Sequence, residues 1–198
     1  MKKLLTIAAM TVLAACATSG TRLDGSACNN QYDCGESDWF ASRVTVEDDR
    51  MESFIRYHTN NSRMPYYPES ILGGIKHDFY FDVRVDRKTG AHVVFVRGFL
   101  QNDRDWAEPS NIYLPEINRY LDLERGSFDV DCSRSSCTHL ENFYGELSPS
   151  FISAFLSFYS DEYATAEVRF NSRVDVDRTI RASELRAVLE AAGITSNY

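Results

Sequence analysis

The chain has 198 residues, of which 43% are hydrophobic and 13% aromatic, and its formal net charge is −8 at pH 7. This length suits one domain, and the apolar content is too high for a disordered spacer. The negative charge makes the chain a poor match for nucleic acid or for an anionic lipid surface. The sequence therefore predicts one folded domain with a real core and no nucleic-acid partner.

The N-terminus has the layout of an export signal. Two lysines are followed by an uncharged run from Leu4 to Val12, which is too short to span a bilayer core of ~30 Å. Leu13-Ala14-Ala15-Cys16 then resembles the lipobox of bacterial lipoproteins, in which the signal is cut before a cysteine that becomes acylated. The resemblance implies a signal peptide over residues 1–15 and a lipid on Cys16. An ordinary cleaved signal peptide is the alternative.

Lipidation would hold the mature chain on a membrane surface. Two or more acyl chains give a stable anchor, at about 0.8 kcal/mol per buried methylene, and the lipoprotein pattern implies more than one chain on Cys16. No later stretch approaches the ~20 apolar residues that a spanning helix needs. Ala17 stands where lipoproteins kept at the inner membrane typically have Asp, so the resemblance favours the periplasmic face of the outer membrane.

Residues 16–38 have the composition of a flexible tether, rich in Ser, Gly, Asn, Asp and Thr. No repeat or second linker follows, and we expect residues 39–198 to form a single β-rich globular domain. Removal of the signal peptide also removes two lysines, so the net charge falls from −8 to −10.

Four cysteines follow Cys16, namely Cys28, Cys34, Cys132 and Cys137. An even number in an exported chain indicates two disulfides. Proximity in the sequence favours Cys28–Cys34 and Cys132–Cys137 among the three pairings. A four-thiolate zinc site is the alternative, although the spacings within the pairs are wider than those typical of structural zinc sites.

The body of the chain is predicted to consist mainly of strands. Apolar residues alternate with polar ones from Phe79 to Val85, residues 86–90 have turn chemistry ending in Gly90, and a second strand runs from His92 to Leu100. These segments predict a hairpin whose second strand is central. Weaker strand candidates are 42–46, 52–58, 111–114, 117–121, 126–131, 138–146 and 163–170.

Two helices are expected near the C-terminus. Ser148 is a good N-cap before Pro149, and an apolar stripe follows at helical spacing. A second helix is predicted from Ser183 to a C-terminal Gly193. The fold class is therefore α+β and β-rich, mainly an antiparallel, sandwich-like sheet with two short C-terminal helices.

No catalytic or cofactor motif stands out, so no catalytic residue, metal ligand or cofactor is assigned. The nearest approaches to a base with an orienting carboxylate are His77-Asp78 and the pair His139 and Glu141, which would share one face of a strand. The plain interpretation of both is that they are strand or surface residues with chance neighbours.

Aromatic residues cluster around the loop Met64–Gly74, which contains Tyr66 and Tyr67. If exposed, these tyrosines would stack on sugar rings or anchor a protein partner. If they line the core, they have a packing role. Replacement of both by alanine separates the alternatives. If the tyrosines bind a partner, binding should weaken without loss of folding, whereas equal loss of both would mean that they belong to the core.

A second resemblance covers about residues 78–145. The run 79–90 (FYFDVRVDRKTG), Asp105-Trp106, Cys132 and Cys137, and the segment 141–143 resemble small exported proteobacterial proteins of unassigned role. The resemblance implies a β-rich extracytoplasmic domain and brings no activity with it.

Two functional hypotheses follow. The first is a non-enzymatic binding or structural module of the cell envelope, anchored by the lipid on Cys16 and in contact with an envelope protein or glycan. The alternative is a hydrolase of envelope polymers that uses a residue such as Glu141 or His139. Single substitutions of these residues would disable the enzyme and spare the binding module.

Overall fold

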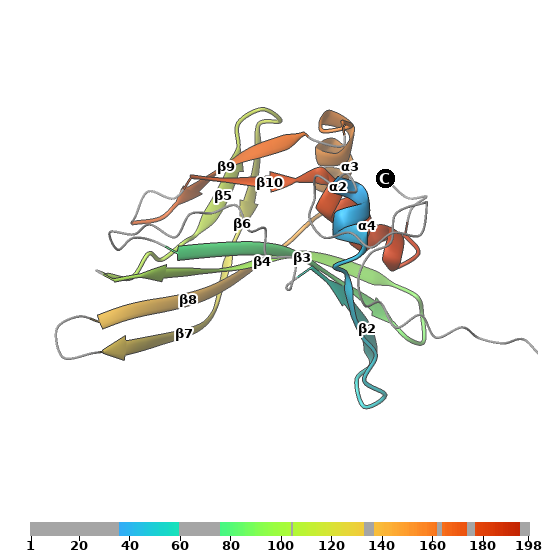
Figure 1. Ribbon diagram of the computed structural model, residues 1–198, viewed down its shortest axis with the longest axis horizontal. Coiled ribbons are helices and arrows are strands. Elements are labelled where there is room, and N and C mark those ends of the chain that lie inside the picture. Colours follow the sequence, from blue (N-terminus) through green and yellow to red (C-terminus); the bar gives the residue numbers. More distant parts are fainter. Residues whose placement is uncertain are drawn as a thin grey trace, which may run out of the picture.

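The computed structural model describes residues 36–59, 76–103, 105–132, 137–161, 164–173 and 177–194. Over these residues the chain forms two antiparallel sheets and three short helices, and the helices and the smaller sheet lie on one side of the larger sheet (Figure 1). The β-rich α+β class predicted from the sequence is confirmed.

The large sheet has six strands, in the order β1 (Thr45–Glu47), β2 (Phe54–His58), β3 (Lys76–Asp86), β4 (His92–Asn102), β8 (Cys137–Glu146) and β7 (Glu124–Cys132). Its centre is the predicted hairpin, in which β3 pairs with β4 in the register Phe81↔Val96. Gly90 has a φ of 71° in the connecting turn, a value that favours glycine. The Asp86 carboxylate accepts the backbone N–H groups of Lys88 and Thr89, which fixes this turn.

The small sheet has four strands, in the order β10 (Asp177–Arg181), β9 (Thr165–Asn171), β5 (Asn111–Leu114) and β6 (Arg119–Asp122). Three phenylalanines join the two sheets, since the ring centroid of Phe79 lies 5.2 Å from that of Phe143 and 5.0 Å from that of Phe170. Contacts of this kind between sheets define the side of the large sheet that we call its inner face.

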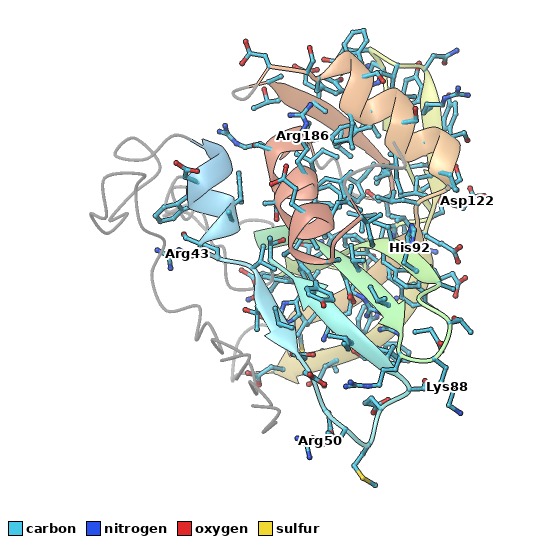
Figure 2. The ribbon with its side chains drawn as sticks, turned by 90° about the vertical axis from the view of Figure 1, so that its right-hand side faces the viewer. Arg43, Arg50, Lys88, His92, Asp122 and Arg186 are labelled. Atoms are coloured by element: carbon cyan, nitrogen blue, oxygen red, sulfur yellow. A yellow bond between two sulfur atoms is a disulfide. The ribbon has the colours of Figure 1, made fainter. Side chains whose placement is uncertain are left out.

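The three helices are α2 (Glu36–Ala41), α3 (Pro149–Phe158) and α4 (Ala182–Ala191). The Ser148 hydroxyl accepts the backbone N–H of Phe151, so the predicted N-cap of α3 is confirmed. The predicted end of α4 is also confirmed, because Gly193 follows it with a φ of 73°. Figure 2 shows α4 above the large sheet, with α2 on one side and α3 on the other.

The predicted strands all correspond to observed ones, with bounds that differ by a few residues. Helix α2 and strand β10 were not predicted. Helix α2 is short, begins in the last residues of the predicted tether and continues into the predicted domain, where Trp39 and Phe40 are buried in the core. Because the helical pattern is only six residues long, the sequence carries too little periodicity to reveal it.

Cys132 and Cys137 form a disulfide across the ends of β7 and β8, with an S–S distance of 2.04 Å. This predicted pair is confirmed. The signal peptide, Cys16, Cys28, Cys34, Tyr66 and Tyr67 lie outside the described residues, so the predictions made for them stay predictions.

Candidate functional site

The outer face of the large sheet, opposite the inner face, carries an unusual group of charged residues. Along β3, Phe81 and Val83 point inward, so Asp82 and Arg84 point outward. Strand β2 places Arg56 opposite Arg84, and strand β4 contributes Arg97. Strand pairing thus gathers three arginines that are far apart in the sequence, and we call Arg56, Arg84 and Arg97 the arginine cluster.

Asp82 lies at the centre of the arginine cluster, and its side chain is fully buried, with 0% exposure. One carboxylate oxygen, Oδ2, is 3.0 Å from Nε of Arg56, 2.5 Å from Nε of Arg97 and 3.8 Å from Nη2 of Arg84. Three guanidinium groups therefore converge on one oxygen of one carboxylate.

Several polar atoms at this centre have no hydrogen-bond partner within the described part of the chain. They include Oδ1 of Asp82 and Nε of Arg84, both of which are buried. Buried polar groups are almost always paired, because an unmade hydrogen bond costs about 1–3 kcal/mol. Within the described part of the chain, Oδ1 of Asp82 and Nε of Arg84 thus each carry an unmade hydrogen bond.

The positive charge of the cluster is only partly compensated. Glu47 adds a second carboxylate at one end, 3.0 Å from Nη1 of Arg56 and 3.0 Å from Nε2 of His58. Burial, together with repulsion by Arg97 and Arg56, lowers the pKa of Arg84 despite the opposing attraction of Asp82. An additional negative group near Arg84 would therefore relieve an unfavourable interaction.

Aromatic rings support the guanidinium groups. The Arg84 guanidinium carbon lies 4.9 Å from the ring centroid of Phe54 and 5.3 Å from that of Phe95. Arg97 lies over Phe95 and Tyr144, 5.4 Å from each centroid. The arginines cover these ring faces, so the rings are poor platforms for stacking sugars. A ligand that approaches this face would meet planar guanidinium groups first.

Carboxylates border the arginine cluster on both sides. On one side the Tyr144 hydroxyl donates to Glu124, a hydrogen bond that raises the pKa of the tyrosine. On the other side is a cavity of about 520 Å³, lined by Glu47, Asp48, Asp49, Glu52, Phe54 and Arg56. No group of three or more His, Cys, Asp or Glu in the described ranges is arranged to hold a metal ion.

Glu141, the carboxylate considered for hydrolysis, lies on the inner face and is 1% exposed. It accepts hydrogen bonds from the backbone N–H groups of Ala107 and Glu108, and from Nη2 of Arg125 at 2.9 Å. Glu108 has a φ of 49°, so the carboxylate holds an unusual backbone turn in place. These partners give Glu141 a structural role.

His139 shares a face of β8 with Glu141, but no hydrogen bond joins them in the described structure. Its ring packs edge-on against Trp106, with centroids 4.7 Å apart, and its buried Nδ1 has no hydrogen-bond partner in the ranges that the structure describes. The side chains of His77 and Asp78 lie outside the described set. Within the described structure His139 and Glu141 thus do not form a base–carboxylate pair, and the one considered for His77 and Asp78 stays a prediction.

Sequence reasoning did not single out Asp82 or the three arginines. Asp82 and Arg84 occupy the polar positions of an alternating strand, which predicts contact with water. The available signal was the hairpin itself, because pairing outward from the turn places Asp82 opposite Phe95 and near Arg97. The pairing of β2 with β3, which adds Arg56, has no such local signal.

Comparison with known proteins gives no family, since no protein-family model, curated protein or solved structure is significantly similar to this chain. Within the described segments, no helix combines the length and apolarity needed to cross a bilayer.

Proposed function

We propose that this protein is a non-enzymatic binding module of the cell envelope that recognises carboxylate or phosphate groups of an envelope polymer through its arginine cluster. The supporting observation is the sharing of one buried carboxylate by three guanidinium groups. Arg84 and Arg97 have side-chain exposures of 32% and 23%, so both are accessible from solvent. Guanidinium groups bind carboxylate and phosphate oxygens through paired hydrogen bonds.

The location of the cluster favours a polymer over a small metabolite. The site lies on the open face of a sheet, and the rings beneath it are covered by guanidinium groups. Such a face suits a chain that presents repeated anionic groups, whereas small ligands are usually enclosed in deeper pockets. In this function Asp82 keeps the mutually repelling arginines together, and the ligand supplies the missing negative charge.

A binding measurement with matched variants tests this role. Oligogalacturonate provides carboxylates, inorganic tripolyphosphate provides phosphates, and neutral dextran is the blank. We expect Arg84→Gln to weaken binding of the preferred anion at least about tenfold, equivalent to about 1.4 kcal/mol. Arg119→Gln removes the same charge from an exposed position on β6 and should leave the affinity unchanged. Equal losses in both variants, or no binding of either anion, would refute the proposed site.

The anchor is the second part of the proposal. Acylated Cys16 would hold the module on the periplasmic face of the outer membrane, within reach of envelope polymers. Replacement of Cys16 by serine should move the folded protein from the membrane fraction to the soluble fraction, without changing its affinity for the anion. A Cys16→Ser variant that stays in the membrane fraction would show that another segment is the anchor.

The hydrolase alternative has no support from Glu141, whose carboxylate is occupied by backbone and arginine donors. Tyr66 and Tyr67 stay candidates for additional contacts with the polymer, to be tested by their double replacement with alanine.

A further inference from the structure

Strand β7 forms one edge of the large sheet and is nine residues long. Within the described part of the chain it pairs only with β8, and Figure 1 shows it at the lower margin of the sheet. Eight of its nine residues are exposed. Long exposed edges invite pairing with another strand, so natural proteins usually shorten or cover them.

The register identifies the backbone groups that point away from β8. The Cα atoms of Cys132 and Cys137 are 4.0 Å apart, which is closer to the ~4.5 Å of a non-hydrogen-bonded antiparallel pair than to the ~5.5 Å of a hydrogen-bonded pair. Because pair types alternate along a strand, Val130 and Phe128 belong to the same type. The N–H and C=O groups of these three β7 residues therefore point toward the open edge.

A hydrogen bond supports this assignment independently. The backbone N–H of Val130 donates to the side chain of Asp129 at 2.8 Å. The Asp129 carboxylate thus occupies the position that the carbonyl oxygen of an added strand would take.

The side chains beside these outward groups divide by face. On the inner-face side Phe128 and Val130 are 63% and 47% exposed, and Trp106 packs against Phe128 with ring centroids 5.7 Å apart. On the other side Asp129 and Asp131 are both exposed. An apolar row and an acidic row therefore run along the same open edge.

We propose that β7 is a docking edge for an extended segment of a partner protein in which apolar and basic side chains alternate. The backbone of that segment would pair with Phe128, Val130 and Cys132, its apolar side chains would cover Phe128 and Val130, and its basic side chains would face Asp129 and Asp131. A second copy of this chain fits poorly, because two β7 strands would bring their aspartates together. The inference does not depend on the arginine cluster, which lies on strands β2, β3 and β4 and not on β7.

The test uses the full mature chain, labelled with ¹⁵N and with its disulfide intact, and a heptapeptide that alternates lysine and valine. A peptide with glutamate in place of lysine is the matched probe. We expect the lysine peptide to shift the amide signals of residues 128–132 and to bind at least about tenfold more tightly than the glutamate peptide. Similar affinities for both peptides, or shifts confined to other residues, would overturn the proposal.

Two variants at position 130 isolate the backbone contribution. Val130→Pro removes an N–H that does not bond to β8, so the fold should survive while peptide binding is lost. Val130→Ala keeps the N–H and should retain most of the binding. If Val130→Pro does not fold, Asp131→Lys serves as the test. Reversal of this exposed charge should lower the affinity for the lysine peptide at least about tenfold. An unchanged affinity in that variant would contradict docking at β7.

Discussion

Asp82 and Glu141 are buried carboxylates on opposite faces of one sheet, and their surroundings differ in kind. Glu141 accepts two backbone N–H groups and one guanidinium, so donors are distributed over both its oxygens. Asp82 has three guanidinium groups around one oxygen, while the other oxygen has no hydrogen-bond partner among the described residues. Burial alone therefore does not distinguish a carboxylate with all its hydrogen bonds made from one with an unmade hydrogen bond. The balance of donors, acceptors and charge around the carboxylate does.

The largest expected effect comes from removal of the satisfied carboxylate. Glu141→Ala leaves Arg125 and two backbone N–H groups without their acceptor, and we expect a loss of about 3–5 kcal/mol in the free energy of unfolding, measured by urea denaturation. The control is Glu146→Ala on the same strand, where the carboxylate is exposed and the change should stay within about 0.5 kcal/mol. Equal losses in the two variants would mean that the hydrogen bonds of Glu141 do not add to the free energy of unfolding.

Asp82→Asn should lower the stability less than Glu141→Ala does, and it should strengthen the binding of anions. The variant keeps the shape of the side chain but removes the central negative charge, so we expect a loss of about 1–3 kcal/mol in unfolding free energy. Added tripolyphosphate should then raise the melting temperature more in the variant than in the unchanged protein, because the arginines have lost their competing counter-ion. An equal rise in both proteins would show that the anion binds elsewhere.

Arg84→Gln should leave the stability nearly unchanged. The pKa of Arg84 is lowered by burial and by repulsion from Arg97 and Arg56, so its charge is unfavourable in the fold without a ligand. We expect the unfolding free energy to change by less than about 1 kcal/mol, in contrast to Asp82→Asn. A loss as large as that of the Asp82 variant would make Arg84 a structural partner of the carboxylate.

The smallest effect concerns a third carboxylate, the half-buried Asp86 at the end of β3. Hydrogen bonds from the Thr89 N–H, the Thr89 hydroxyl and the Lys88 N–H lower its pKa. Its contribution to stability is therefore complete above the ordinary aspartate pKa of about 3.9, and is lost as the pH falls through the lower value of the folded state. A carboxyl NMR titration should place its pKa below that of the unfolded chain, and Asp86→Asn should weaken the acid dependence of unfolding. A pKa at or above the ordinary value would contradict the geometry of this turn.

Local patterns predicted much of the fold. The alternation from Phe79, the turn ending at Gly90 and the N-cap Ser148 each act within a few residues, so the sequence displays them directly. The pairing of β4 with β8 joins segments about forty residues apart and has no local signal. For the same reason Glu141 was noticed through its neighbour His139 and not through Ala107 and Arg125, which are its real partners.

The candidate site was harder to predict than the fold. A polar residue in an alternating strand normally faces water, and nothing in the sequence around Asp82 reveals that arginines from three strands cover it. The charges that define the site become visible only when the register of β2, β3 and β4 is known. Register depends on the whole sheet, which explains why the elements were predicted and their chemistry was not.

The disulfide at the end of the β7–β8 hairpin has a consequence for biogenesis. Its cysteines are five residues apart, so under the export that we propose they would meet as soon as this one hairpin has reached an oxidising compartment. Helices α3 and α4 and strands β9 and β10 all follow it in the chain and are not needed for the bond. An oxidase acting on the emerging polypeptide would thus close this pair early, which removes two thiols from competition with the cysteines of the N-terminal segment and limits mispairing during export.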